Sequence, residues 1–191
     1  MTLPPVIRVF FAIDLPEATK KEVGKFISQL KKQSKSHAIR WTKPENLHIT
    51  LQFLAEVKTE HLPMLIERVR GKMHGRHQPV QLALGAVHLF PNPYRPRVIV
   101  LDVMPQDQLA LLSSLIGQGI VDARYAIEER PFRGHLTIGR IKQPQGVDLN
   151  FLSSSSSMQD LEKVEINEVV LFRSEPQPEG SKYTVLEKMS L

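Results

Sequence analysis

The segment Leu47-His48-Ile49-Thr50-Leu51 and the segment Gly134-His135-Leu136-Thr137-Ile138 share one pattern: His, an apolar residue, Thr and a second apolar residue. Successive side chains of a β-strand point to opposite faces, so the His and the Thr of each copy project together. The apolar residues then face the other way, toward a core. Two such copies in one chain predict two similar lobes that place their His–Thr pairs across a common cleft.

The apolar residues outside these motifs alternate between strand-like and helix-like spacing. Strands are expected at residues 6–13, 47–54, 80–89, 98–103, 135–141, 164–172 and 183–189. Helices are expected after Pro16, after Thr59 and around residues 109–116, each with one apolar face. Regular βαβ alternation is weak, which favours an α+β fold with antiparallel sheets. No linker or charged tail divides the sequence, so residues 1–191 are expected to form a single domain.

The composition narrows the function classes. The chain has 191 residues, no cysteine and a formal net charge of +5 at pH 7. The lack of cysteine excludes disulfide frameworks, thiol nucleophiles and thiolate metal sites, and it suits a reducing compartment, so we expect a cytoplasmic protein. The first apolar run, at residues 6–13, is too short to span a membrane. The basic charge favours anionic partners such as RNA, although a solvated basic surface fits the same number.

The paired motifs suit acid/base chemistry, because neither contains a cysteine or a clustered carboxylate that would bind a metal. An imidazole with an ordinary pKa of about 6.5 gains or loses a proton near neutral pH, so two histidines across a cleft can act as a base and an acid. In-line displacement at phosphorus needs a proton-transfer partner for both the attacking and the leaving oxygen. The hydroxyls of Thr50 and Thr137 can then hold the nonbridging oxygens. A cyclic phosphodiester fits such a reaction, with no metal and no cofactor.

Further segments resemble a known family in the same way as the motifs do. They are Arg8-Val9-Phe10-Phe11-Ala12-Ile13, Arg40-Trp41 before the first motif and Arg130-Pro131-Phe132 before the second. With the motifs, they resemble the 2H phosphoesterase superfamily, and more narrowly its RNA 2′,3′-cyclic phosphodiesterases, also called bacterial/archaeal 2′-5′ RNA ligases. The resemblance implies a bilobal fold, with two antiparallel sheets and flanking helices related by a pseudo-twofold axis around the cleft.

The resemblance also implies an activity, namely hydrolysis of RNA 2′,3′-cyclic phosphate ends to 2′-phosphomonoesters without a metal. By the same resemblance, His48 would be the proton donor to the departing 3′-oxygen, and His135 would be the proton acceptor from water. The implied substrate is RNA with a cyclic phosphate end, tRNA halves among such RNAs, or a cyclic nucleotide. The protein is expected to work as a monomer, without a membrane.

Aromatic residues near the motifs are candidates for base stacking or for the cleft rim. Trp41 and Phe132 each precede a motif histidine by a few residues, and each could stack on a base or pack in the core. Phe10 and Phe11 point to opposite faces of their strand, so at most one of them reaches the cleft.

Several cations are candidates for contacts with phosphate. Strict alternation places Arg140 away from the motif side chains, which makes it the weaker phosphate ligand unless Gly139 introduces a bulge. Arg95, Arg97, Arg130 and Arg133 offer further contacts. Residues 20–43 carry eight Lys or Arg and one acidic residue, a bias that suits either RNA guidance or a solvated helix face.

Two other functions stay open for this sequence. The 2′-5′ ligation of tRNA halves would use the same cleft as its main activity. A noncatalytic nucleotide-binding or RNA-binding module would keep the fold without the chemistry. Intact His and Thr at all four motif positions speak against the binding module.

Overall fold

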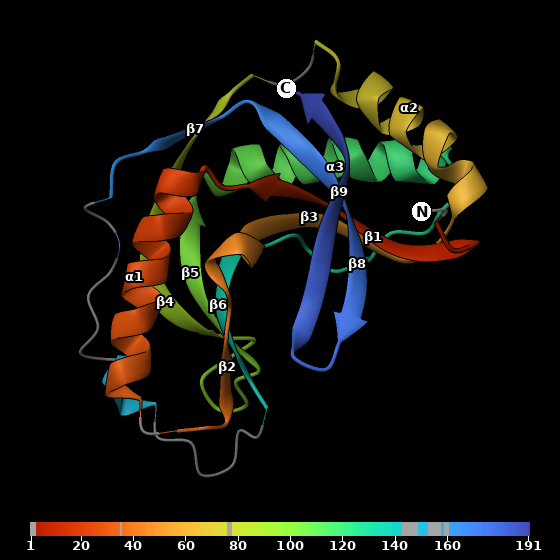
Figure 1. Ribbon diagram of the computed structural model, residues 1–191. Helices are drawn as coiled ribbons and strands as arrows, with labels where there is room; N and C mark the ends of the chain where they lie inside the picture. Colours follow the sequence, from red (N-terminus) through yellow and green to blue (C-terminus); the bar gives the residue numbers. More distant parts are fainter. Residues whose placement is uncertain (1–2, 35, 76–77, 143–148, 153–157, 159–160) are drawn as a thin grey trace.

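The computed structural model describes residues 3–34, 36–75, 78–142, 149–152, 158 and 161–191. Within them the chain forms two antiparallel sheets with flanking helices (Figure 1). The four-stranded sheet has the order β3-β1-β8-β9, and the five-stranded sheet has the order β2-β6-β5-β4-β7. The predicted α+β, bilobal arrangement is therefore confirmed, with one sheet in each lobe.

The two motifs open two strands, one in each sheet. The strands are β1 (Val6–Asp14), β2 (Ile39–Trp41), β3 (His48–Lys58), β4 (Val80–Phe90), β5 (Val98–Met104), β6 (His135–Ile141), β7 (Val164–Ile166), β8 (Glu168–Gln177) and β9 (Gly180–Ser190). The helices are α1 (Glu17–Gln33), α2 (Leu62–Met73) and α3 (Gln106–Asp122), with the 3₁₀ turns η1 (Pro44–Asn46), η2 (Thr59–His61) and η3 (Asn150–Leu152). Of the helices that the structure describes, none combines the length and apolar character needed to cross a bilayer.

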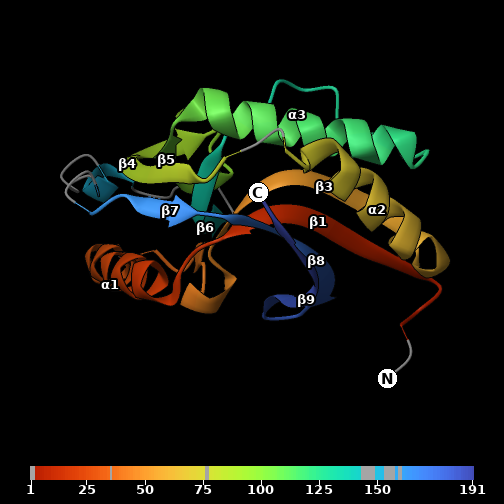
Figure 2. The same ribbon diagram turned by 90° about the horizontal axis from the view of Figure 1, so that it is seen from above.

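The helices are exchanged between the lobes. Helix α1 follows β1 of the four-stranded sheet but lies beside the five-stranded sheet, whereas α3 follows β5 and packs on β3 with α2 at its side (Figures 1 and 2). The apolar stripe of α1 that the sequence spacing predicts is buried: Val23, Phe26, Ile27 and Leu30. Gly119 lets α3 approach α2 closely, because a Cβ there would lie 2.5 Å from the Cα of Val69.

One apolar core runs through both lobes. Phe11 of the four-stranded sheet and Leu101 of the five-stranded sheet are fully buried in the same cluster. A smaller cluster on the other face of the four-stranded sheet contains Phe10 and Phe172, with Tyr183 packed against them. Phe10 and Phe11 thus lie on opposite faces, as the strand period predicts.

Two strands and one helix start differ from the expectations. The single strand expected over residues 164–172 is divided at Asn167 into β7, which pairs with β4, and β8, which pairs with β1. This segment therefore contributes to both sheets. Strand β2 was not expected, because three residues are too few to show a period. Thr59 begins the 3₁₀ turn η2, and α2 itself begins at Leu62.

Candidate active site

Each motif is followed directly by a β-bulge. In β3 the pairing with β1 steps over Leu51, which directly follows the Thr of the first motif. In β6 the pairing with β5 steps over Ile138, which directly follows the Thr of the second motif. A bulge resets the alternation of side chains between the faces of a strand. The two lobes therefore carry the same backbone irregularity at the same place.

The bulge at Ile138 changes where Arg140 points. Strict alternation would turn Arg140 away from the motif side chains, but Arg140 lines the same cleft as His135 and Thr137. The corresponding position in β3 is Phe53, whose side chain is 47% exposed. The two bulges thus bring one further side chain from each strand to the motif face, and Arg140 is better placed for phosphate than alternation suggested.

A polar side chain of α3 holds the backbone of each motif. Ser113 Oγ donates to the Leu51 carbonyl at 2.8 Å and accepts from Gln52 Nε2 at 3.0 Å, so the bulged carbonyl keeps a hydrogen bond. Gln106 Oε1 accepts from the Gly134 N–H at 3.0 Å, and Gln106 Nε2 donates to the Gly134 carbonyl at 2.8 Å. One helix therefore fixes the backbone at both motifs.

Both motif histidines are oriented by the same hydrogen bond. His48 Nδ1 lies 2.7 Å from the carbonyl of Asn46, and His135 Nδ1 lies 2.8 Å from the carbonyl of Arg133. A carbonyl oxygen only accepts, so we assign the hydrogen to Nδ1 in each ring. Each Nε2 is then left for exchange of a proton with a ligand, and Nε2 of His48 lies 3.1 Å from Thr50 Oγ1.

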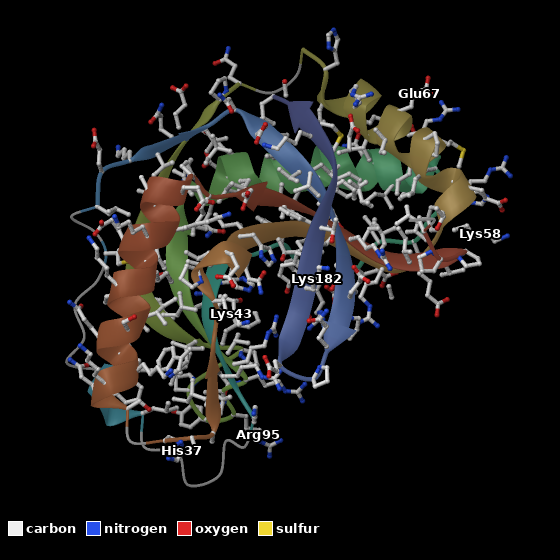
Figure 3. All side chains as sticks on the ribbon, viewed as in Figure 1. His37, Lys43, Lys58, Glu67, Arg95 and Lys182 are labelled. Atoms are coloured by element: carbon white, nitrogen blue, oxygen red, sulfur yellow. The ribbon has the colours of Figure 1, made fainter. Side chains whose placement is uncertain are left out.

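A cleft with a volume of about 620 Å³ joins the lobes at the motifs, and we call it the central cleft. All four motif residues line it, together with Arg140. Its other lining cations are Arg95, Arg97 and Arg130, of which Arg95 is labelled in Figure 3. Small-molecule sites typically have volumes of about 300–1,000 Å³, so the central cleft can hold a nucleotide.

A second hollow, of about 250 Å³, opens beside His48, and we call it the β2–β9 groove. It shares His48, Thr137 and Arg140 with the central cleft, whereas His135 lines only the central cleft. Its walls come from β2 with the residues that follow it and from the β8–β9 hairpin: Arg40, Trp41, Lys43, Asn46, Ser181 and Tyr183. Asn46 Nδ2 donates to the Ser181 carbonyl at 3.1 Å and so ties the two walls together.

Aromatic rings enclose His48. The ring centroids of Phe10 and Tyr183 lie 4.8 Å and 5.1 Å from that of His48. This burial lowers the pKa of His48 from its ordinary 6.5 to about 4. Arg140 and Lys20 add to the decrease in pKa, whereas the Asn46 carbonyl and Asp14 oppose it. His48 is therefore neutral at pH 7 in the ligand-free protein.

Each motif histidine also has an aspartate as its pairing partner on the neighbouring strand. Asp14 of β1 is opposite the first histidine, and Asp102 of β5 is opposite the second. Both carboxylates hold a basic group, since Lys20 Nζ lies 2.8 Å from Asp14 and His88 Nε2 lies 2.7 Å from Asp102. Neither aspartate was predicted from the sequence. The available signal is an aspartate two or three residues before the proline that precedes a helix, found at the end of β1 and near the end of β5.

The remaining candidate residues lie in different places. Trp41 lines the β2–β9 groove and packs against the main core, and Phe132 packs against the same core. The Arg133 guanidinium lies 5.9 Å from the ring centroid of Phe90. Phe90, which was not predicted as a site residue, stacks on His135 with 5.2 Å between the ring centroids. Nothing in the sequence around Phe90 predicts this contact, because it joins the end of one strand to the start of another.

The geometry can transfer protons around a bound anion. The central cleft carries two imidazoles, two hydroxyls and a guanidinium from the motif face of two strands. Across the described ranges, no group of three or more His, Asp or Glu side chains is arranged to hold a metal ion.

Comparison with known proteins agrees with this geometry. Residues 13–100 match the LigT-like phosphoesterase family. Over 187 residues the chain is 31% identical to the RNA 2′,3′-cyclic phosphodiesterase of Methanothermobacter thermautotrophicus, covering 97% of this chain and 99% of that one. Two similar crystal structures are a Thermus thermophilus protein (TM-score 0.79, 27% identity) and E. coli LigT complexed with 3′-AMP (TM-score 0.78, 25% identity). Each of these covers 97% of this chain and 98% of the other.

Proposed function

Because this chain belongs to the family of LigT-like phosphoesterases, we propose that it hydrolyses RNA 2′,3′-cyclic phosphate ends to 2′-phosphomonoesters. One observation carries the proposal: the His and Thr of both motifs, which come from different sheets, line a single cleft with Arg140. In hydrolysis of a cyclic phosphodiester, the attacking water oxygen and the leaving ribose oxygen lie on opposite sides of phosphorus, and this cleft offers an imidazole from each lobe.

In the proposed reaction, the oxygen of a water molecule forms a bond to phosphorus while the bond from phosphorus to the ribose 3′-oxygen breaks. Nε2 of His135 accepts a proton from the water, and Nε2 of His48 donates a proton to the 3′-oxygen. Thr50 and Thr137 donate hydrogen bonds to the nonbridging oxygens, and Arg140 balances their charge. The product is a 2′-phosphomonoester with a free 3′-hydroxyl, and no metal or cofactor takes part.

The lowered pKa of His48 is compatible with this scheme when the charge of the bound substrate is included. With a pKa of about 4, His48 is neutral at pH 7 before the substrate binds. A bound cyclic phosphate brings a negative charge beside the ring, and a nearby opposite charge favours the protonated form. The substrate therefore raises the pKa of His48, so that the proton donor forms in the complex with RNA rather than in the free enzyme.

Identification of the product tests the proposal. Adenosine 2′,3′-cyclic phosphate is incubated with the protein in EDTA, and the product is identified by phosphorus NMR. We expect the 2′-monophosphate, and no product with a His48→Ala, His135→Ala double variant. A 3′-monophosphate would reverse the assigned roles of the two histidines, and the absence of turnover in EDTA would contradict the metal-free mechanism.

Ligation is the second candidate, and the further cations of the central cleft are the observation that favours it. Arg95 and Arg97 line this cleft in addition to Arg140, so they could hold the phosphates of a second RNA strand there. An RNA 5′-hydroxyl in place of water would give a 2′-5′ linkage by the same proton transfers. The ratio of linked to hydrolysed product with tRNA halves measures this preference. The tRNA half as natural substrate, the monomeric state and the cytoplasmic location stay predictions.

A further inference from the structure

The β2–β9 groove lies on the leaving-group side of the proposed reaction. His48 lines this groove, whereas His135 lines only the central cleft. If His48 protonates the 3′-oxygen, the ribose that carries this oxygen lies on the His48 side of phosphorus. The remainder of the RNA is attached to that ribose through its 5′-oxygen. The RNA chain is thus directed into the β2–β9 groove.

The positively charged side chains of the groove favour the binding of an anion. Arg40 of β2 is the pairing partner of Arg140 of β6, and both side chains line the groove with Lys43. Like charges directly opposite each other on neighbouring strands are destabilising. In the part of the chain that the structure describes, none of these three side chains forms an ion pair with a carboxylate, although the exposed Glu179 lines the groove at the hairpin turn. A phosphodiester between the two guanidiniums would remove their repulsion.

The walls of the groove also carry aromatic rings. Tyr183 meets the His48 ring edge-on at 5.1 Å, and Trp41 lies on the opposite wall, beside Arg40. The indole of Trp41 also packs against the main core, and its ring centroid lies 6.4 Å from that of Phe151. Binding sites for single-stranded nucleic acid usually combine cations along the sugar-phosphate backbone with aromatic side chains on which the bases stack. In Figure 3, Lys43 lies on the β2 side of the groove and Lys182 lies on β9.

From these observations we infer that the β2–β9 groove binds the phosphodiester that joins the last nucleotide of the RNA to the one before it. Arg40 and Lys43 are the binding residues for this phosphate, and Arg140 stands between it and the reacting cyclic phosphate. The groove is smaller than a typical small-molecule site, which suits a sugar-phosphate backbone with a base stacked at its edge. The inference rests on the proposed function, and it makes RNA ends better substrates than free cyclic nucleotides.

The test uses two substrates that differ only in this phosphate, adenosine 2′,3′-cyclic phosphate with and without a 5′-phosphate. We expect kcat/KM to be about tenfold or more higher with the 5′-phosphate, the size of one charge-assisted contact. The Arg40→Ala, Lys43→Ala double variant should bring this ratio close to one. Arg95→Ala should keep the ratio, and Arg68→Ala, an exposed change on α2, should keep both rates.

A ratio near one in the unaltered protein would overturn the inference. So would a ratio that falls in Arg95→Ala and persists in the double variant, because the central cleft rather than the groove would then hold this phosphate. Calorimetric titration with adenosine 2′-phosphate and adenosine 2′,5′-bisphosphate separates this inference from the proposed function. Tighter binding of the bisphosphate that depends on Arg40 and Lys43 supports the groove site even if hydrolysis fails, whereas equal affinities contradict it.

Discussion

The two halves of the site share their backbone and differ in their surroundings. Each histidine opens a strand, donates Nδ1–H to the carbonyl two residues earlier, and is followed by a bulge after the Thr. His48, however, is covered by Phe10 and by Tyr183 of the β8–β9 hairpin. His135 is flanked by Phe90, and its neighbour Asp102 holds His88. The motif therefore fixes the geometry of each histidine, while the neighbouring strands determine which side chains surround it.

Removing either imidazole should have the largest effect. We expect His48→Ala and His135→Ala each to lower kcat by about 10²–10⁴-fold, the usual contribution of a general acid or base. The double variant should lose little more than the worse single variant, because the two residues act in one step. Kinetics with adenosine 2′,3′-cyclic phosphate measures this, with circular dichroism as the control for folding. Near-normal turnover in either single variant would contradict a two-histidine mechanism.

Opening the aromatic cover over His48 should raise the pKa of this histidine. Tyr183→Ala admits water to His48, so we expect its pKa to rise from about 4 toward 6.5. Phe90→Ala changes the ring that covers His135 and should leave the pKa of His48 in place. NMR titration of the imidazole Cε1–H signals follows both rings. An unchanged His48 in Tyr183→Ala would show that burial by the hairpin is not the cause.

The supports on α3 should differ in how much stability they contribute. Ser113→Ala leaves the carbonyl of the bulged Leu51 buried without its donor, so we expect a loss of about 1–3 kcal/mol in the free energy of unfolding. Gln106 is half-buried, so water can take the place of its side chain at the buried Gly134, and Gln106→Ala should lower kcat more than stability. Urea unfolding and steady-state kinetics compare the two variants. A larger stability loss in Gln106→Ala would reverse this comparison.

The last comparison concerns the pH dependence of stability. The unfolded chain protonates His48 near its ordinary pKa of 6.5, whereas the folded protein protonates it only near 4. His48 therefore contributes full stability above pH 6.5, and this contribution is lost as the pH falls from 6.5 to 4. Between pH 7 and pH 4.5, the free energy of unfolding measured in urea should fall less in His48→Asn than in the unaltered protein. The His135→Asn variant is the matched control. It keeps His48, so it should still show the decrease in the free energy of unfolding that His48 causes at low pH.

The sequence predicts the parts of this site that depend on local spacing. The period of two placed His48 with Thr50 and separated Phe10 from Phe11, because alternation is a property of a single strand. The bulge after Thr137 depends on the register with β5, so Gly139 was the only sign of this bulge in the sequence. The turn of Arg140 toward the cleft followed from that register.

Contacts between segments distant in the sequence lay beyond prediction. The stacking of Phe90 on His135 and the position of Asp102 beside it depend on how β4, β5 and β6 are ordered in their sheet. The division at Asn167 is a similar case. A single polar residue within an apolar run did not indicate that the chain leaves one sheet and enters the other.

The exchange of elements between the lobes has a consequence for folding cooperativity. Strand β2 precedes the first motif but pairs with β6 of the second lobe, while β8 follows the second motif and pairs with β1. Neither lobe can be cut from the chain without leaving strand edges and a helix-covered face open to water. We therefore expect both lobes to unfold together, so that the loss of catalysis tracks global unfolding and no half-folded species keeps a working histidine pair.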